Sequence, residues 1–176
     1  MSVETNEDQV PNSFCDGIDK LIAGIGHFVM WTNGILVLVI ILQVVLRYGF
    51  GRGLVVLEEL QWHLYAIGIM FGASYASMKN SHIRVDIIHA RLSKKWQQRW
   101  DLFGIIFLLL PFICVIFLQS IDFVSESWRV NERSDAPLGL PWRWAIKGVI
   151  PISFGLLFVA TISRGVRAVI SLKEGK

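Results

Sequence analysis

Long uncharged apolar runs constrain this chain more than any other feature. Residues 28–46 and 102–121 are dominated by Val, Ile, Leu and Phe, and neither run contains Asp, Glu, Lys or Arg. A helix of roughly 20 such residues crosses the hydrocarbon core of a bilayer. Because no water inside a bilayer can bond to an exposed peptide group, a chain there must form a helix or a closed barrel. The two runs therefore predict transmembrane helices.

Two weaker apolar stretches, residues 59–78 and 148–163, predict two more transmembrane helices. The expected fold class is an all-α membrane protein with four spans and short amphipathic surface helices. A chain of 176 residues favours one domain, and we expect it over residues 13–176. Residues 1–12 are polar and acidic, which predicts a disordered tail.

Features between the spans give finer expectations. Apolar residues in Phe14–Ile25 recur at helical spacing, which fits either a helix along the membrane surface or an extension of the first span. Ile87–Arg99 is a second amphipathic piece. Pro111 predicts a bend in the third span, and Pro151 is expected in the first turn of the fourth. Asp122–Lys147 is expected to be the longest irregular loop.

Composition supports a membrane protein. The chain is 53% hydrophobic and 18% charged, whereas soluble domains carry about 25% charged residues. All seven Trp residues lie near the ends of the predicted spans, as in the aromatic belts of membrane proteins. No basic cluster is interleaved with aromatic residues on a soluble face, so we expect no binding to nucleic acid.

The distribution of positive charge predicts the orientation. If both termini are cytoplasmic, the cytoplasmic segments hold eleven of the 17 Lys and Arg residues. Lys and Arg are enriched in cytoplasmic loops. The sequence therefore predicts a membrane protein with both termini in the cytoplasm (N-in, C-in), and the basic loop Lys79–Arg99 contributes most to that prediction.

Charged side chains gather where the first span ends and the second begins. Arg47 lies close in sequence to Glu58 and Glu59, with Trp62 one turn beyond Glu58. A carboxylate at a membrane interface gains from a nearby guanidinium. We interpret this group as an interfacial ion pair that fixes the hairpin or contacts another subunit. The alternative, a proton or cation site, is less favoured because transporters bind substrate at the midplane.

The second span also carries small residues. They are Gly68, Gly72, Ala73 and Ala76. Small residues let helices approach closely in lipid, so they predict a helix-packing face that meets protein.

Catalytic and metal-binding motifs are absent from the sequence. The four His residues do not suggest two haem ligands at matched depth, and there is no H-E-x-x-H, paired C-x-x-C or phosphate-binding loop. We expect no enzyme, no cofactor and no metal.

Three motifs follow one another along the chain. The first motif is Leu46-Arg47-Tyr48 followed by Glu58, Glu59 and Trp62. The second is the loop motif His82-Ile83-Arg84-Val85-Asp86, and the third is the loop Pro137-Leu138-Gly139-Leu140-Pro141-Trp142. Together they resemble one family, the small (Q-type, DctQ-like) membrane subunit of tripartite ATP-independent periplasmic (TRAP) transporters. The resemblance covers about residues 15–170.

The resemblance implies a scaffold rather than a carrier. A periplasmic binding protein would deliver an organic acid, a large membrane subunit would carry it with sodium ions, and this chain would brace the large subunit within the bilayer. The loop motif with His82, Arg84 and Asp86 would be cytoplasmic, and the loop with Pro137, Gly139, Pro141 and Trp142 would face the periplasm. Two alternatives from other classes stay open: an anchor subunit of a respiratory complex, and a small proton-coupled exporter.

Overall fold

A computed structural model describes residues 13–78 and 94–174, and every regular element within them is a helix. The elements are α1 (Ser13–Val44), η2 (Val45–Gly49), α2 (Val55–Met78), α4 (Lys94–Gly104), η3 (Ile105–Leu109), α5 (Leu110–Arg129) and α6 (Arg143–Glu174), where η denotes a π-helical turn. The all-helical fold class is confirmed for these residues. The expected tail at 1–12 and the motif with His82, Arg84 and Asp86 lie outside the described residues.

Three helices of the described residues are long and apolar enough to cross a membrane. They are Asp16–Gly49, Arg99–Arg129 and Arg143–Ile170. The helix α2 is not among them, because polar residues near its start lower its hydropathy. The second of the four predicted spans, residues 59–78, therefore stays a prediction.

The helices are longer than the predicted spans. The segment Phe14–Ile25 is not a separate surface helix, because α1 is continuous from Ser13 to Val44. The described part of Ile87–Arg99 is likewise the start of a rod that continues through η3 into α5. Hydropathy marks only the part of a helix that suits lipid, whereas backbone hydrogen bonds continue until a residue interrupts them.

Two prolines have different effects. Pro111 lies in the first turn of α5, two residues after the end of the π-helical turn η3, so the helix changes its hydrogen-bond spacing close to the residue that lacks a backbone donor. The predicted bend in this span stays a prediction. The placement of Pro151 in a first turn was wrong, because α6 begins at Arg143 and Pro151 lies inside it. The irregular loop is also shorter than Asp122–Lys147, since helices extend to Arg129 and resume at Arg143.

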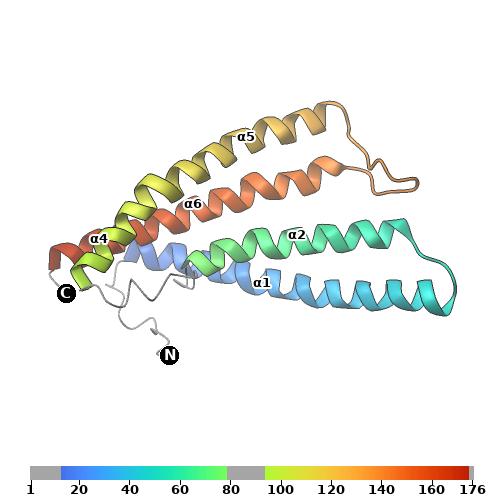
Figure 1. Cartoon of the computed structure of the whole chain (residues 1–176), viewed down its shortest axis with the longest axis horizontal. Coiled ribbons are helices and arrows are strands. Elements are labelled where there is room, and N and C mark those ends of the chain that lie inside the picture. The colour runs from blue at the N-terminus through green and yellow to red at the C-terminus, as the bar shows by residue number, and fades with distance from the viewer. Residues whose placement is uncertain (1–12, 79–93, 175–176) are drawn as a thin grey trace.

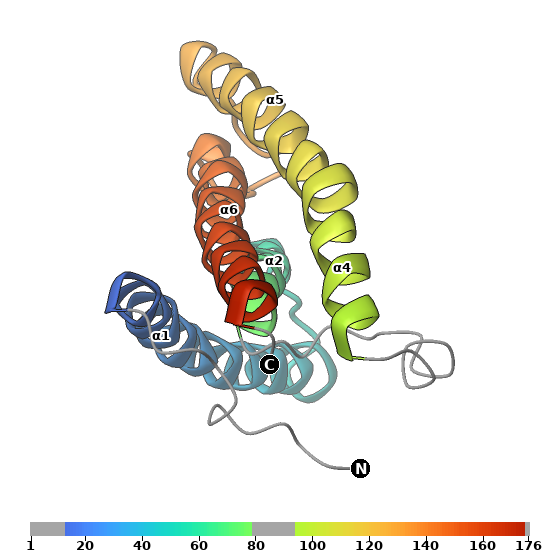
Figure 2. The same ribbon diagram turned by 90° about the vertical axis from the view of Figure 1, so that its left-hand side faces the viewer.

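The helices form an open layer rather than a closed bundle. The pair α1 and α2 makes one hairpin, α5 and α6 make the other, and α2 packs against α6 to join them (Figure 1). Figure 2 shows α1 and α5 on opposite sides of α6, and α5 packs principally on α6. The α1–α2 turn and the α5–α6 loop lie at the same end of the layer.

Small polar residues make the contact between the hairpins. Ser74 and Ser153 are 1% and 2% exposed, and the Ser74 hydroxyl donates to the Ser153 carbonyl at 3.0 Å. Small side chains allow this close approach, and each hydroxyl finds a carbonyl acceptor. Ile22, Met78 and Ala160 form the apolar cluster where α1, α2 and α6 meet.

Ion pairs join α1 and α6 at the end of the layer that lies opposite the α1–α2 turn and the α5–α6 loop. The Arg167 guanidinium on α6 donates to Asp16 at 2.9 Å and to Asp19 at 2.7 Å, both on α1. The arginine side chain is only 13% exposed, so these pairs are shielded from salt better than surface pairs are.

The packing of α1 on α2 predicts a sharp difference between two nearby glycines. A Cβ at Gly26 would lie 2.5 Å from the Tyr75 ring, whereas a Cβ at Gly24 meets nothing within 4 Å. Overpacking of this kind costs about 1–3 kcal/mol. We expect Gly26→Ala to lower Tm in detergent and Gly24→Ala to leave it unchanged or higher. Equal effects of the two variants would contradict this packing.

Candidate functional site

The loop between α5 and α6 has a defined, non-helical course. Three of its non-glycine residues have backbone angles in the left-handed region: Asn131 (φ 47°), Leu138 (φ 65°) and Trp142 (φ 62°). Such angles are uncommon for residues other than glycine and persist where the surroundings fix them. A turn with Gly139 N–H donating to the Ala136 carbonyl at 3.0 Å closes the tip.

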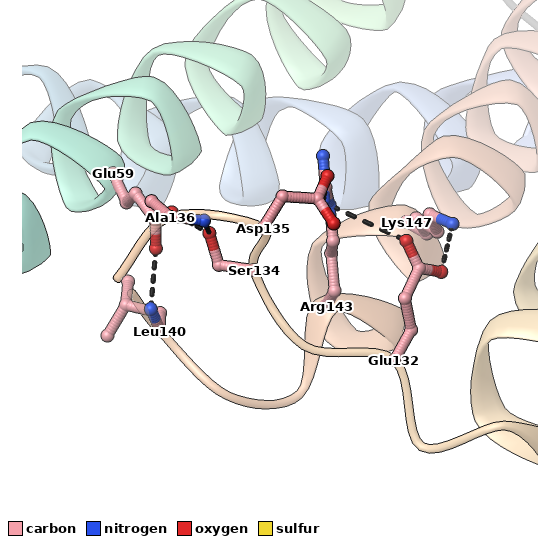
Figure 3. A network of polar contacts seen from close by, with 8 residues as sticks. All are labelled: Glu59, Glu132, Ser134, Asp135, Ala136, Leu140, Arg143 and Lys147. Atoms are coloured by element: carbon pink, nitrogen blue, oxygen red, sulfur yellow. Dashed lines mark hydrogen bonds and ion pairs between the residues drawn. The ribbon is translucent and has the colours of Figure 1, made fainter. Parts of the chain in front are cut away.

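The carboxylate of Glu59, in the second turn of α2, holds this loop (Figure 3). The Leu140 N–H donates to Glu59 Oε2 at 2.5 Å, and the Ser134 hydroxyl donates to Oε1. A Cβ at Gly139 would lie 2.7 Å from Glu59 Oε1 and 2.5 Å from Ser134 Cβ, so only glycine fits there. We call Glu59, Ser134, Gly139 and Leu140 the loop clamp. The loop clamp joins the two hairpins at the end of the layer that carries the α1–α2 turn and the α5–α6 loop.

A second group of charges fixes the loop to the start of α6. Glu132 pairs with Lys147 and lies 3.6 Å from Arg143 Nε, and Arg143 Nη1 lies 3.1 Å from Asp135. The Lys147 ammonium also sits 3.9 Å from the centre of the Phe123 ring on α5. The hydrogen bond from Lys147, together with the positive charge of Arg143, lowers the pKa of the Glu132 carboxyl.

The predicted interfacial group divides into two. Arg47 Nη1 lies 3.5 Å from Glu58 Oε1, which also accepts a 3.1 Å bond from the buried Gln43 amide. The Gln43 side-chain oxygen also accepts a hydrogen bond from the Leu54 N–H at 3.4 Å, so Gln43 closes the turn between α1 and α2. Glu59 instead faces the loop clamp. Sequence reasoning missed Gln43, although an amide inside an apolar run signals a buried hydrogen bond.

The predicted packing face of α2 is only partly used within the chain. A Cβ at Gly68 would lie 2.6 Å from Asn33 Oδ1 on α1, whereas one at Gly72 meets nothing within 4 Å. Ala73 is exposed and Ala76 half-buried. Their contact with another protein stays a prediction, as does that of the exposed Trp62.

The predicted loop residues have different surroundings. Gly139 belongs to the loop clamp, whereas Pro137, Pro141 and Trp142 are exposed. Across residues 13–78 and 94–174, no group of three or more His, Cys, Asp or Glu side chains could hold a metal ion. The site therefore consists of hydrogen bonds and ion pairs that fix one hairpin against the other.

Comparison with known families decides the identity. Residues 36–170 match the family model described as tripartite ATP-independent periplasmic transporters, DctQ component. The chain belongs to this family. It is a multi-pass membrane protein and the small permease component of a TRAP transporter, in a family of transporter components rather than enzymes. No curated protein matches the chain.

The loop clamp predicts that Glu59 contributes more to stability than a surface acid of this DctQ-family subunit. Glu59→Ala removes two hydrogen bonds, each worth about 1 kcal/mol. We expect a clear loss of Tm in detergent. The control Glu126→Ala breaks an exposed pair with Arg129 and should change Tm little. A larger loss for the control would contradict the clamp.

The lowered pKa of the Glu132 carboxyl predicts that the stability of this TRAP subunit depends on pH. Because its pKa is lower in the folded state, its contribution is complete above the ordinary value of 4.5 and is lost as pH falls through the lower folded pKa. Tm of the native chain should therefore fall more steeply below about pH 4.5 than Tm of Glu132→Gln. Parallel curves for the two proteins would show that the pair with Lys147 does not stabilise the fold.

Proposed function

We propose that this chain is a non-catalytic scaffold that braces the large membrane subunit of its TRAP transporter. The large subunit carries an organic acid with sodium ions, and a periplasmic binding protein delivers that acid. The observation that supports the scaffold role most strongly is the open face of α2.

This open face is exposed and carries aromatic and small residues. Trp62, Tyr65 and Ile69 are 70%, 51% and 52% exposed, and Ala73 continues the stripe one turn further. Space beside Gly72 is open. The helix carrying the stripe falls below the hydropathy of the three candidate spans. A face of aromatic and small residues allows another protein helix to approach closely.

The layer is also suited to a bracing role because both of its ends are tied. The loop clamp links α2 to the α5–α6 loop, and Arg167 links α6 to Asp16 and Asp19 on α1. These contacts resist sliding of one hairpin along the other. A moving subunit could therefore work against a layer of fixed shape.

We further propose four spans with both termini in the cytoplasm of a bacterial inner membrane. The helices α2 and α6 lie side by side and run in the same direction (Figure 1). Because α6 is apolar enough to cross the bilayer, its neighbour α2 would lie at the same depth and cross with it. The α5–α6 loop would then face the periplasm, where a binding protein docks.

This topology predicts the pattern of cysteine labelling in intact cells. In a chain with Cys15 and Cys114 replaced by Ser, an impermeant maleimide should label Asp135→Cys, whose native side chain is 98% exposed. It should label Lys20→Cys only after the membrane is opened. The opposite pattern would reverse the orientation, and labelling of both in intact cells would refute an even number of spans.

Partner binding gives the test of the scaffold role. We expect the tagged chain to co-purify with a larger membrane protein encoded as part of the same transport system. Ala73→Trp should reduce that co-purification several-fold by filling the open face, since small residues permit close helix contact. The control Val115→Trp changes an exposed residue of α5 and should have no effect. Transport by the chain alone in proteoliposomes would refute a scaffold.

A further inference from the structure

Four aromatic side chains form an exposed row along α4 and η3. Trp96, Trp100, Phe103 and Phe107 are 53%, 57%, 47% and 65% exposed. Their spacing of four, three and four residues places them on one helix face. The Trp100 and Phe103 ring centres lie 5.9 Å apart, and those of Phe103 and Phe107 lie 4.8 Å apart. The rings are thus in contact from Trp100 to Phe107, and Trp96 lies one turn before them.

Positive charge gathers at the start of this row. The Arg99 guanidinium lies 5.3 Å from the centre of the Trp96 ring. The sequence of α4 also contains Lys94 and Lys95, against Asp101 as its only acid. A guanidinium over an indole stays oriented and keeps donors free for an anion. This end of the row is therefore complementary to a negatively charged group.

The length of the helix places the charge and the row at different depths. The candidate span Arg99–Arg129 has 31 residues and would be about 46 Å long, whereas a hydrocarbon core is about 30 Å thick. The charged turns of α4 would therefore lie among the lipid headgroups. The row from Trp96 to Phe107 descends about 16 Å along the helix, close to the depth of one leaflet.

We propose that this face of α4 binds an anionic phospholipid. Arg99 and the Trp96 indole hold its phosphate group, and an acyl chain lies along Phe103 and Phe107. The helix α4 lies at the outer edge of the layer, where it packs on α6 and away from α1 (Figure 2). Below Arg99 the row consists of aromatic rings, and Asp101 is the only acid of α4, so the row suits a lipid acyl chain.

The test measures which lipid stays with the full chain. The protein is purified in mixed micelles that contain equal amounts of phosphatidylglycerol and phosphatidylcholine, and the lipids retained are quantified by mass spectrometry. One cation near a membrane surface favours an anionic lipid about five-fold. We expect that enrichment in the native chain, its loss in Arg99→Gln, and its retention in Arg99→Lys. The control Arg52→Gln removes an equal charge from the α1–α2 turn and should keep the enrichment.

Other results would overturn the proposal. Equal retention of both lipids by the native chain would show that no headgroup is selected. Equal losses in Arg99→Gln and Arg52→Gln would indicate a general effect of charge. In the assembled transporter, a photocrosslinker at Phe107 that labels protein and no lipid would show that a subunit covers the face. The lipid-retention measurements use the chain without a partner, so their failure would leave the scaffold role standing.

Discussion

The contact between α2 and α6 holds the rest of this structure together. Each hairpin has its own turn, and within residues 13–78 and 94–174 helix packing and the end contacts join one hairpin to the other. In lipid, apolar surfaces gain little from meeting each other, so close packing and hydrogen bonds must provide the association. The buried Ser74 and Ser153 provide both. A larger residue at either position would separate the helices and weaken the contacts at the two ends.

The end contacts depend on that central contact and also reinforce it. Glu59 reaches the backbone of Leu140 because α2 and α6 run side by side and leave the loop above the start of α2. Arg167 reaches Asp16 because α1 continues well beyond the apolar segment predicted for it. Glu59 and Asp16 both lie outside the most apolar part of their helices, and a charge costs less there than in the hydrocarbon core. Because the helices extend beyond their apolar segments, hydrogen bonds and ion pairs can join them without placing charge in the hydrocarbon core.

Much of the architecture follows from the sequence, for physical reasons. Uncharged runs dictate helices in lipid, and Pro111 and the glycines of the first turn mark interruptions that local chemistry enforces. Pairing is harder to foresee. Glu58 and Glu59 are neighbours in sequence, yet their side chains point to different elements: Glu58 toward the first turn and Glu59 toward a loop 75 residues away. Helical geometry predicts that adjacent residues diverge, but it cannot say what each will meet.

The polarity of α2 explains why hydropathy alone undervalued this helix and why it is central to the structure. A helix surrounded by lipid must be apolar on every side, whereas α2 has α1 on one side and α6 on another. Its serines are buried against those neighbours, and its remaining face combines aromatic and small residues rather than long aliphatic ones. A helix with such a composition is stable in a membrane only when protein covers most of it. Both acids of α2 already have hydrogen-bond partners within the chain, so its open face of aromatic and small residues is the part best suited to meet another membrane protein.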